Sequence, residues 1–256
     1  MFDSGVGGLT VLAELRRVMP QARVIYAADM AGLPYGAKTE AQVAARVAGL
    51  LGRMTERFAP RLVCIACNTA STIALSAVRE VLEVPIVGTV PAIKPAAAVT
   101  KTGVIGLLGT AATVRQGYVD DLEKEFARGK RLLRYGANEL VALGEAKLRG
   151  ETVNPDEVAK AARGLVMQPY GQDLDTVVLA CTHFPLLLDE LAEAFGPQVA
   201  FVHGANGIAR RVASLSQGRD WSRRIVERAV TTGPLEDFER LSSAFERLGI
   251  KRLETF

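Results

Sequence analysis

Short apolar runs alternate with amphipathic stretches along most of this 256-residue chain. The runs are rich in Val, Ile and Leu and do not alternate with polar residues, which is typical of strands buried on both faces of a parallel sheet. We expect such strands at residues 24–28, 62–66, 86–89, 104–108, 176–180 and 199–202.

The stretches between these runs have helical periodicity. We expect helices at residues 9–18, 40–58, 71–82, 112–127, 138–148, 155–167 and 185–195, and a tail that is helical from 222 to 248. Strands that alternate with helices form βαβ units with right-handed crossovers. The predicted fold class is therefore α/β, with mostly parallel sheets flanked by helices.

A Pro-containing segment at residues 88–95 is the best candidate for a crossing between two domains. A return crossing near residues 204–207 leaves the tail to complete the first domain. We therefore expect a discontinuous first α/β lobe of residues 1–90 and 206–256, and a second α/β lobe of residues 91–205.

Charged residues are evenly mixed, so the formal charge of +3 does not indicate nucleic acid binding. The pairs Arg210-Arg211 and Arg223-Arg224 fit the solvated faces of helices. No apolar run approaches the roughly 20 residues that span a bilayer, and the N-terminus lacks the parts of a signal peptide. We expect no membrane partner and a cytoplasmic location. Three cysteines without a disulfide framework fit a reducing compartment.

Two of the cysteines stand in matching local sequences, VCIACNTAS around Cys67 and VVLACTHFP around Cys181. Each follows an expected strand and precedes an expected helix, the place where open α/β sheets bind ligands. A helix N-terminus or a nearby cation lowers the pKa of a thiol and so raises its thiolate fraction. Two thiols that flank one small molecule would suit the transfer of a proton from one face of a carbon to the other. His183 and Asp3 are candidates to assist Cys181 and Cys67.

Other interpretations of the cysteines stay open. A cysteine at the end of an apolar strand is often a small core residue. Cys64 and Cys67 form a CxxC, but Cys64 lies inside the expected strand with its side chain on the opposite face, so we interpret Cys64 as core. Cys67, Cys181 and His183 are an incomplete set of zinc ligands without clustered spacing, and we expect no metal.

Polar side chains also follow Cys67 and the N-terminal residues. Asn68, Thr69 and Ser71 are all N-cap types in front of an apolar-periodic run. The string DSGVGG, which starts at Asp3 and Ser4, suits an anion cradle, and a tight turn capped by a serine explains it equally well.

Three further loops or helices carry polar residues. Thr110 and Thr113 lie at a turn into a helix, where such residues are more often caps than ligands. Asp29 precedes the string PYG at residues 34–36, a structural turn that becomes a candidate substrate loop because it shares a sheet edge with the loops above. Glu145 lies on a polar helix and, by its surroundings alone, is expected to be exposed to solvent.

The motifs DSGVGGLTV, AD at Asp29 followed by LPYG, CNTAS, GTAATV and CTHFPLL occur in this order between residues 2 and 211. Together they resemble the glutamate racemase family of the aspartate/glutamate racemase superfamily. The resemblance implies two pseudo-symmetric α/β lobes with the active site in the cleft between them. It also implies cofactor-independent interconversion of L- and D-glutamate, which supplies D-glutamate for peptidoglycan, and leaves a homodimer open.

The resemblance further implies roles for individual residues. Cys67 would take the α-proton from D-glutamate and Cys181 from L-glutamate, assisted by Asp3 and His183. Asp29 and Glu145 match supporting carboxylates. The family's substrate contacts fall on Asp3, Ser4, Tyr35, Gly36, Asn68, Thr69, Thr182 and His183, with Thr110 and Thr113 as further candidates.

Some positions depart from the family pattern. Only Met1 and Phe2 precede Asp3, where relatives carry a complete first strand, so we expect a curtailed strand there. The string HGAN at residues 203–206 replaces a common Asp-Ser-Gly-Glu, Ala137-Asn138 replaces Cys-Pro, and Phe184 replaces Tyr.

Two alternative functions stay open at this stage. Two thiols define the type of reaction better than the side chain of the substrate, so a racemase of aspartate or another small acidic amino acid is one alternative. A binding protein with a racemase fold and decayed catalysis is the other. Lys38 and Lys94 have no phosphate cup around them, so a pyridoxal cofactor gains no support.

Overall fold

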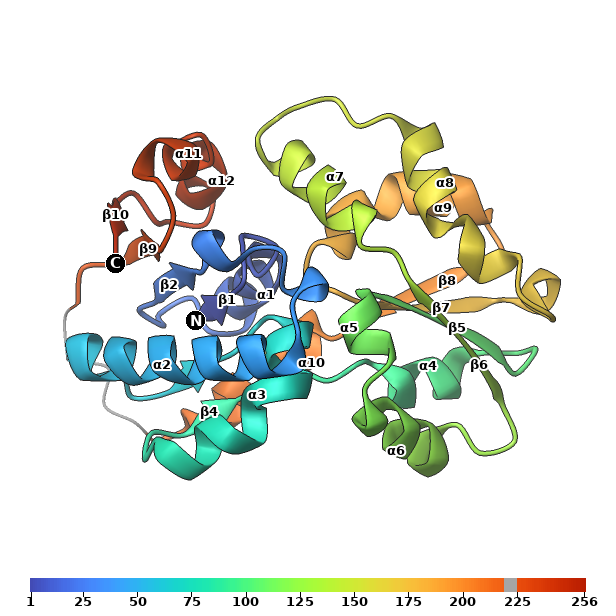
Figure 1. The fold of residues 1–256 in the computed structure, drawn as a ribbon, viewed down its shortest axis with the longest axis horizontal. Helices are drawn as coiled ribbons and strands as arrows, with labels where there is room; N and C mark the ends of the chain where they lie inside the picture. The colour runs from blue at the N-terminus through green and yellow to red at the C-terminus, as the bar shows by residue number, and fades with distance from the viewer. Residues whose placement is uncertain (219–224) are drawn as a thin grey trace. The chain divides into compact units, whose positions relative to one another are not determined.

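The computed structural model of the protein describes residues 1–218 and 225–256. The chain forms two compact units, one of Met1–Thr89 with Ala205–Phe256 and the other of Val90–Gly204 (Figure 1). Each is an α/β unit with parallel strands and flanking helices, so the predicted fold class is confirmed.

The first unit is built on parallel strands. One sheet has the order β1 (Phe2–Asp3), β2 (Ile25–Ala28), β9 (Arg228–Thr231) and β10 (Leu253–Thr255). A second parallel pair, β3 (Val63–Cys64) and β4 (Ile86–Val87), meets β1 through a bridge between Phe2 and Ile65. The short strand β1 therefore lies between β2 and β3, at the centre of the unit.

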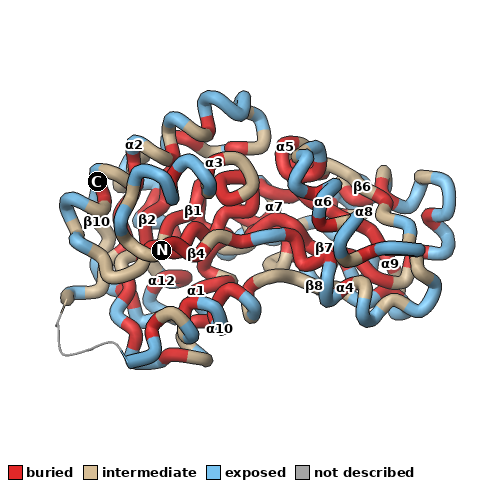
Figure 2. Tube along the Cα trace, turned by 90° about the horizontal axis from the view of Figure 1, so that it is seen from below, coloured by how far each residue is buried: buried red, intermediate tan, exposed pale blue. Residues whose placement is uncertain are grey.

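Helices cover both sides of these strands (Figure 2). On one side lie α2 (Glu40–Phe58) and α3 (Asn68–Val81), and on the other lie α1 (Leu9–Val18) and α10 (Ala205–Leu215). The apolar faces of α2 and α3 join residues of the strands in one buried cluster, which includes Val47, Ala74 and Ile65. Burial on both sides explains why the strands are continuous apolar runs.

The C-terminal segment completes the first unit. After β9 it forms the short helices α11 (Leu235–Glu239) and α12 (Ser242–Glu246) and then β10. Phe245 contacts the rings of Tyr26 and Phe238, with centroids 5.3 Å and 5.0 Å away. The 3-10 turns η1 (Met30–Gly32) and η2 (Tyr35–Ala37) lie in the loop between β2 and α2.

The second unit has one parallel sheet in the order β6 (Arg131–Gly136), β5 (Val104–Gly109), β7 (Thr176–Ala180) and β8 (Ala200–His203). In Figure 1, α4 (Ile93–Val99) and α6 (Gly117–Phe126) lie below this sheet. Above it lie α7 (Glu139–Leu148), α8 (Pro155–Val166) and α9 (Leu188–Phe195). Shorter elements are α5 (Ala111–Val114), η3 (Gly171–Asp173) and η4 (Phe184–Leu187).

Several predicted elements differ from the structure. The helix expected at 112–127 is broken into α5 and α6, and the helix expected at 185–195 begins as η4 before α9. The edge strand β6 was not predicted because its sequence, RLLRYG, mixes charged and apolar residues as a partly exposed strand does. The helix α4 was not predicted either, since its segment was interpreted as a domain crossing.

The prediction of a continuously helical tail is wrong. Residues 228–231 form β9, and only residues 235–239 and 242–246 are helical. The four residues of β9 are too few to show a period of their own between charged, helix-favouring neighbours. Residues 222–224, including the pair Arg223-Arg224, lie outside the described residues. Arg210 and Arg211 are exposed on α10, as expected. No helix among the described residues is long and apolar enough to cross a membrane.

Gly136, the last residue of β6, leaves no room for a side chain. A Cβ atom there would lie 2.7 Å from the Cα of Ala111 and 2.9 Å from its nitrogen. We expect Gly136→Ala to lower the free energy of unfolding by about 1–3 kcal/mol, because the backbone of α5 has to move. Gly117→Ala is the control, since no atom lies within 4 Å of the position that its Cβ would take. Urea unfolding measures both variants, and equal stability of the two would contradict the prediction.

Candidate active site

Cys67 is the N-cap residue of α3, directly after the strand region that ends at Ala66. Its sulfur accepts a hydrogen bond from the Ala70 N–H at 3.4 Å and lies 3.4 Å from the Ser4 hydroxyl oxygen. The thiol is buried. An N-terminal backbone N–H and the helix dipole both favour a negative charge on this sulfur. Asn68, Thr69 and Ser71 were expected as caps, and the structure gives that position to the cysteine itself.

Asp3 lies at the end of the central strand β1, beside the strand that leads to Cys67. The Ala66 N–H donates to the Phe2 carbonyl at 2.8 Å, which fixes the register of the two segments. The Asp3 carboxylate is fully buried and accepts hydrogen bonds from the N–H groups of Gly8 at 3.0 Å and Gly5 at 3.4 Å. The glycine-rich turn therefore does bind an acidic group, and that group is the chain's own Asp3 side chain.

Asn68 and Thr69 occupy the first turn of α3 and are buried. Ser71 has a structural role, because its hydroxyl donates to the Ile65 carbonyl at 3.2 Å and accepts from the Thr89 N–H at 3.0 Å. We refer to Asp3, Ser4, Cys67, Asn68 and Thr69 as the Cys67 cluster.

Asp29 is fully buried at the end of β2 and binds three side chains. Tyr35 donates from its hydroxyl to Oδ2 at 2.6 Å, and Thr232 donates from its hydroxyl to Oδ1 at 2.5 Å. Arg46 donates from Nε to Oδ2 and from Nη2 to Oδ1, the latter at 2.6 Å. Burial alone would raise the pKa of Asp29, but the hydrogen bonds from Arg46, Thr232 and Tyr35 outweigh it and hold that pKa below its usual value.

Tyr35 is buried with its hydroxyl turned to Asp29. Burial and the neighbouring carboxylate both raise the pKa of its phenol, so the hydroxyl stays a hydrogen-bond donor. The next residue, Gly36, is partly exposed in η2.

Cys181 follows β7 in the second unit and begins a chain of polar contacts. Its sulfur lies 3.8 Å from Nδ1 of His183, and Nε2 of His183 lies 2.8 Å from Oε1 of Glu145. All three side chains are buried, and we refer to them with Thr182 as the Cys181 cluster. Burial would lower the pKa of His183, but hydrogen bonds to Cys181 and Glu145 raise it well above 6.5. A ring with a raised affinity for a proton is therefore held beside the thiol.

The expectation that Glu145 is exposed is wrong. Its side chain is only 5% accessible, because it points from α7 to His183. Gly144 makes this packing possible, since a Cβ there would lie 3.0 Å from the His183 Cβ and 3.1 Å from its carbonyl oxygen. The resemblance predicted a supporting role for this carboxylate that its own surroundings in the sequence did not indicate.

Thr110 and Thr113 lie at the same sheet edge as the Cys181 cluster. Gly109 pairs with Ala180 across β5 and β7, so the residues that follow them, Thr110 and Cys181, leave the sheet side by side. Thr110 is the N-cap of α5, and its hydroxyl oxygen accepts from the Thr113 N–H at 3.2 Å and lies 3.0 Å from the Thr113 hydroxyl. Both threonines are buried, and Thr110 is the residue that caps α5.

The third cysteine, Cys64, is buried inside β3. Burial raises the pKa of its thiol to about 11, which keeps it protonated and unreactive at neutral pH. All three cysteines are free thiols.

Two departures from the family pattern have local structural roles. Asn138 accepts a hydrogen bond from the Ala111 N–H at 2.9 Å and so ties the loops after β5 and β6 together. Asn206 donates to Glu14 at 2.9 Å, which connects α10 to α1.

Sequence reasoning missed Arg46 and Thr232. Arg46 stands on the apolar stripe of α2, between Val43, Val47 and Leu50, where a charged residue needs a buried partner. The position of an arginine on this apolar stripe could have indicated a buried acidic partner in the sequence. Thr232 gave none, because its segment was predicted to be helical.

Known proteins share this fold and much of this sequence. A sequence profile of the Asp/Glu/Hydantoin racemase family matches residues 10–212. A glutamate racemase of Sphingopyxis alaskensis is 62% identical over 220 residues, which cover 86% of this chain and 82% of that protein. A glutamate racemase of Pectobacterium carotovorum is 46% identical over 220 residues, which cover 86% and 76%. The structure is similar to that of Escherichia coli glutamate racemase in complex with L-glutamate and the activator UDP-MurNAc-ala, with a TM-score of 0.92, 40% identity, and 100% and 96% of the two chains covered.

The chain belongs to the Asp/Glu/hydantoin racemase family and is an amino-acid racemase. Its relatives at 62% and 46% identity are glutamate racemases.

The contact between Glu145 and His183 predicts a pH-dependent stability. In Glu145→Gln the side chain cannot carry the charge that raises the His183 pKa, so that pKa falls. A raised folded-state pKa stabilises the fold fully below the unfolded value of about 6.5, and this gain is lost as the pH rises through the folded value. The wild-type protein should therefore exceed Glu145→Gln in free energy of unfolding most below about pH 6, and this difference should shrink as the pH rises.

Urea unfolding at several pH values measures this difference. Glu139→Gln, at a partly exposed position on the same helix, is the control and should follow the wild-type profile. A difference between the wild-type protein and Glu145→Gln that stays constant with pH would contradict the coupling.

Proposed function

We propose that the protein interconverts L- and D-glutamate by direct proton transfer between two thiols, without a cofactor. The observation that carries this proposal is the repeated environment of Cys67 and Cys181. Each is a buried free thiol just past the carboxyl end of a parallel strand, and each has its own polar partners.

In this mechanism the Cys67 thiolate removes the α-proton of D-glutamate, and the electron pair of the broken C–H bond remains on the α-carbon. The Cys181 thiol then donates its proton to the opposite face and becomes a thiolate. The reverse direction starts with Cys181 and L-glutamate. Because the enantiomers have equal free energy in water, two chemically equal bases suit an enzyme that works in both directions.

The two thiolates are stabilised in different ways. Cys67 accepts from the Ala70 N–H at the start of α3, with Ser4 alongside, whereas Cys181 lies beside an imidazole that is held by Glu145. We assign Asp3 and His183 to assist Cys67 and Cys181. Preorganised donors around each thiol also lower the cost of the charge that develops on the substrate.

The proposed substrate contacts are the residues that the family resemblance indicated. The hydroxyl of Tyr35 donates a hydrogen bond to Asp29, so Tyr35 would contact the substrate through its backbone. Gly36 would also use its backbone. The full set is Asp3, Ser4, Tyr35, Gly36, Asn68, Thr69, Thr110, Thr113, Thr182 and His183. In cells the D-glutamate formed would supply peptidoglycan synthesis, a role typical of this family.

Exchange with solvent deuterium tests the reaction. We expect L-glutamate in D2O to gain α-deuterium as D-glutamate forms, with no added cofactor, because the proton that returns comes from a thiol that has exchanged with solvent. NMR and chiral chromatography follow deuterium and product. Faster α-deuterium exchange in aspartate than in glutamate would make aspartate the substrate. If no acidic amino acid gained α-deuterium, the protein would be a binding protein and not a racemase.

Substitution of single cysteines tests the mechanism. We expect Cys67→Ser and Cys181→Ser each to lower kcat/KM by at least about 1,000-fold, since a serine hydroxyl is a far weaker acid than a thiol. Cys64→Ser is the matched control and should keep most of the activity, because its thiol is protonated in the core. Racemisation that survives in either of the first two variants and fails in the control would refute the assignment.

A further inference from the structure

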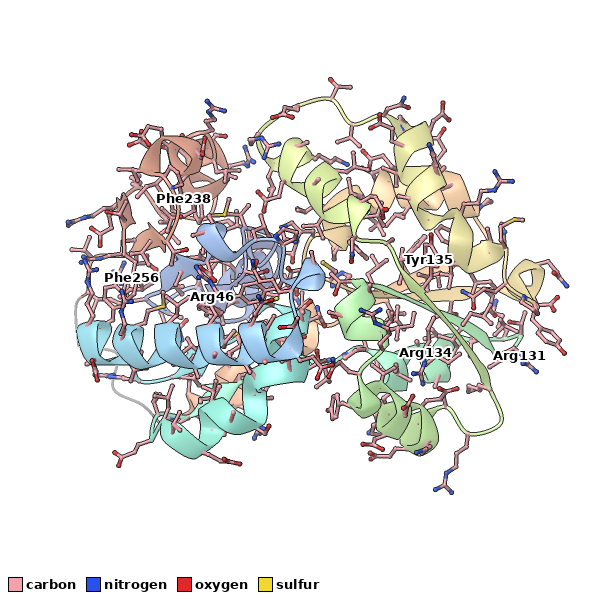
Figure 3. The ribbon with its side chains drawn as sticks, viewed as in Figure 1. Arg46, Arg131, Arg134, Tyr135, Phe238 and Phe256 are labelled. Atoms are coloured by element: carbon pink, nitrogen blue, oxygen red, sulfur yellow. The ribbon has the colours of Figure 1, made fainter. Side chains whose placement is uncertain are left out.

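Three segments of the first unit meet at the Asp29 carboxylate. Tyr35 comes from the loop after β2, Arg46 from α2, and Thr232 from the segment after β9. Figure 3 shows Arg46 on α2 on the side of strands β1 and β2. Because Arg46 binds both carboxylate oxygens, it fixes the orientation of Asp29 as well as its charge.

The space between this group and Gly32 is filled. A Cβ atom on Gly32 would lie 2.2 Å from Asp29 Oδ2, 2.5 Å from Arg46 Nε and 2.8 Å from Tyr35 Cε1. Only a glycine fits at that point of the loop. The positions of Asp29, Arg46 and Tyr35 are therefore set jointly, and none can shift without the others.

This group reaches the Cys67 cluster through Tyr35. Tyr35 and Cys67 belong to the same cluster of buried residues, together with Val43 and Val47 of α2. Charge on the Cys67 sulfur acts on the phenol of Tyr35 and contributes to its raised pKa, after burial and Asp29. Tyr35 and the Cys67 thiol thus lie in one buried cluster, close enough for their charges to interact.

Thr232 connects the C-terminal segment to the same loop. Its N–H donates to the Ala28 carbonyl at 3.2 Å, and its hydroxyl oxygen accepts from the Ala31 N–H at 3.1 Å while donating to Asp29. The loop after β2 is thereby bound both by α2, which follows it in the sequence, and by the segment after β9. Thr232 lies outside residues 10–212, the part of the chain that the family profile matches.

We propose that Arg46 and Thr232 are positioning residues for the proton transfer at Cys67. They clamp Asp29, and Asp29 holds Tyr35 and its loop against the thiol. This inference rests on the two-thiol mechanism proposed above. Neither residue touches the reacting atoms in this scheme, and both act through Asp29.

The first test is steady-state kinetics. Arg46→Met should lower kcat/KM about 10- to 100-fold, because the buried carboxylate loses its charged partner. Thr232→Val, which replaces the hydroxyl group by a methyl group, should give a smaller loss of kcat/KM. Thr232→Ser keeps the hydroxyl group and should keep the wild-type activity. Arg53→Met, at an exposed position of the same helix, is the control and should match the wild-type enzyme.

Isotope effects distinguish positioning from a loss of folded protein. Slower proton removal by Cys67 makes that step more rate-limiting, so the deuterium isotope effect on kcat/KM should rise for D-[2-2H]glutamate and fall for L-[2-2H]glutamate. A variant that is merely less folded lowers both rates and leaves both isotope effects unchanged. Unchanged isotope effects in Arg46→Met, or unchanged activity, would overturn the proposal.

Glu145→Gln separates this proposal from the mechanism on which it rests. Because Glu145 acts on the Cys181 side, its variant should shift the two isotope effects in the direction opposite to Arg46→Met. If Arg46→Met instead lowered the isotope effect for D-[2-2H]glutamate and raised it for L-[2-2H]glutamate, while Glu145→Gln did the reverse, the positioning role would stand. The two thiols would then act on the opposite enantiomers from those assigned here. Shifts in the same direction for both variants would refute the positioning role, and activity in Cys67→Ser would refute the mechanism itself.

Discussion

A parallel strand that is covered on both faces has little room for charged or reactive side chains except at its ends. This constraint places the chemistry of the protein. The strands β1, β2, β5 and β7 are fully or mostly buried, and Asp3, Asp29, Thr110 and Cys181 all appear where one of them stops. The α/β layers thereby gather reactive groups at the carboxyl edge of each sheet and keep them away from the apolar core.

Three buried carboxyl groups near these edges are each matched by partners of a different kind. Asp3 uses the backbone N–H groups of a glycine turn, and Asp29 uses an arginine and two hydroxyl groups. Glu145 lies against an imidazole. An unpaired carboxylate at such a depth would be protonated or would destabilise the fold, so the partners are as necessary as the carboxylates themselves.

Much of this arrangement was predictable from the sequence, because the main strands and the helices α1 and α2 have strong periods and clear ends. The two cysteines could be singled out by their matching neighbours, and the family resemblance added Asp29 and Glu145. Sequence periodicity did not reveal the features that depend on tertiary contacts. The strand β9 has only four residues and is a strand because β2 and β10 lie on either side of it. Glu145 has the sequence surroundings of a surface residue, and only the packing of α7 against η4 buries it.

The position of β9 has a consequence for the order of folding during synthesis. The second unit is one continuous stretch, Val90–Gly204, so all of it can leave the ribosome before the first unit is complete. The first unit must wait for β9 to enter between β2 and β10, and Asp29 has no hydroxyl partner from Thr232 until then. A nascent chain therefore carries one thiol in a finished environment and the other in an unfinished one until β9 and β10 have been made.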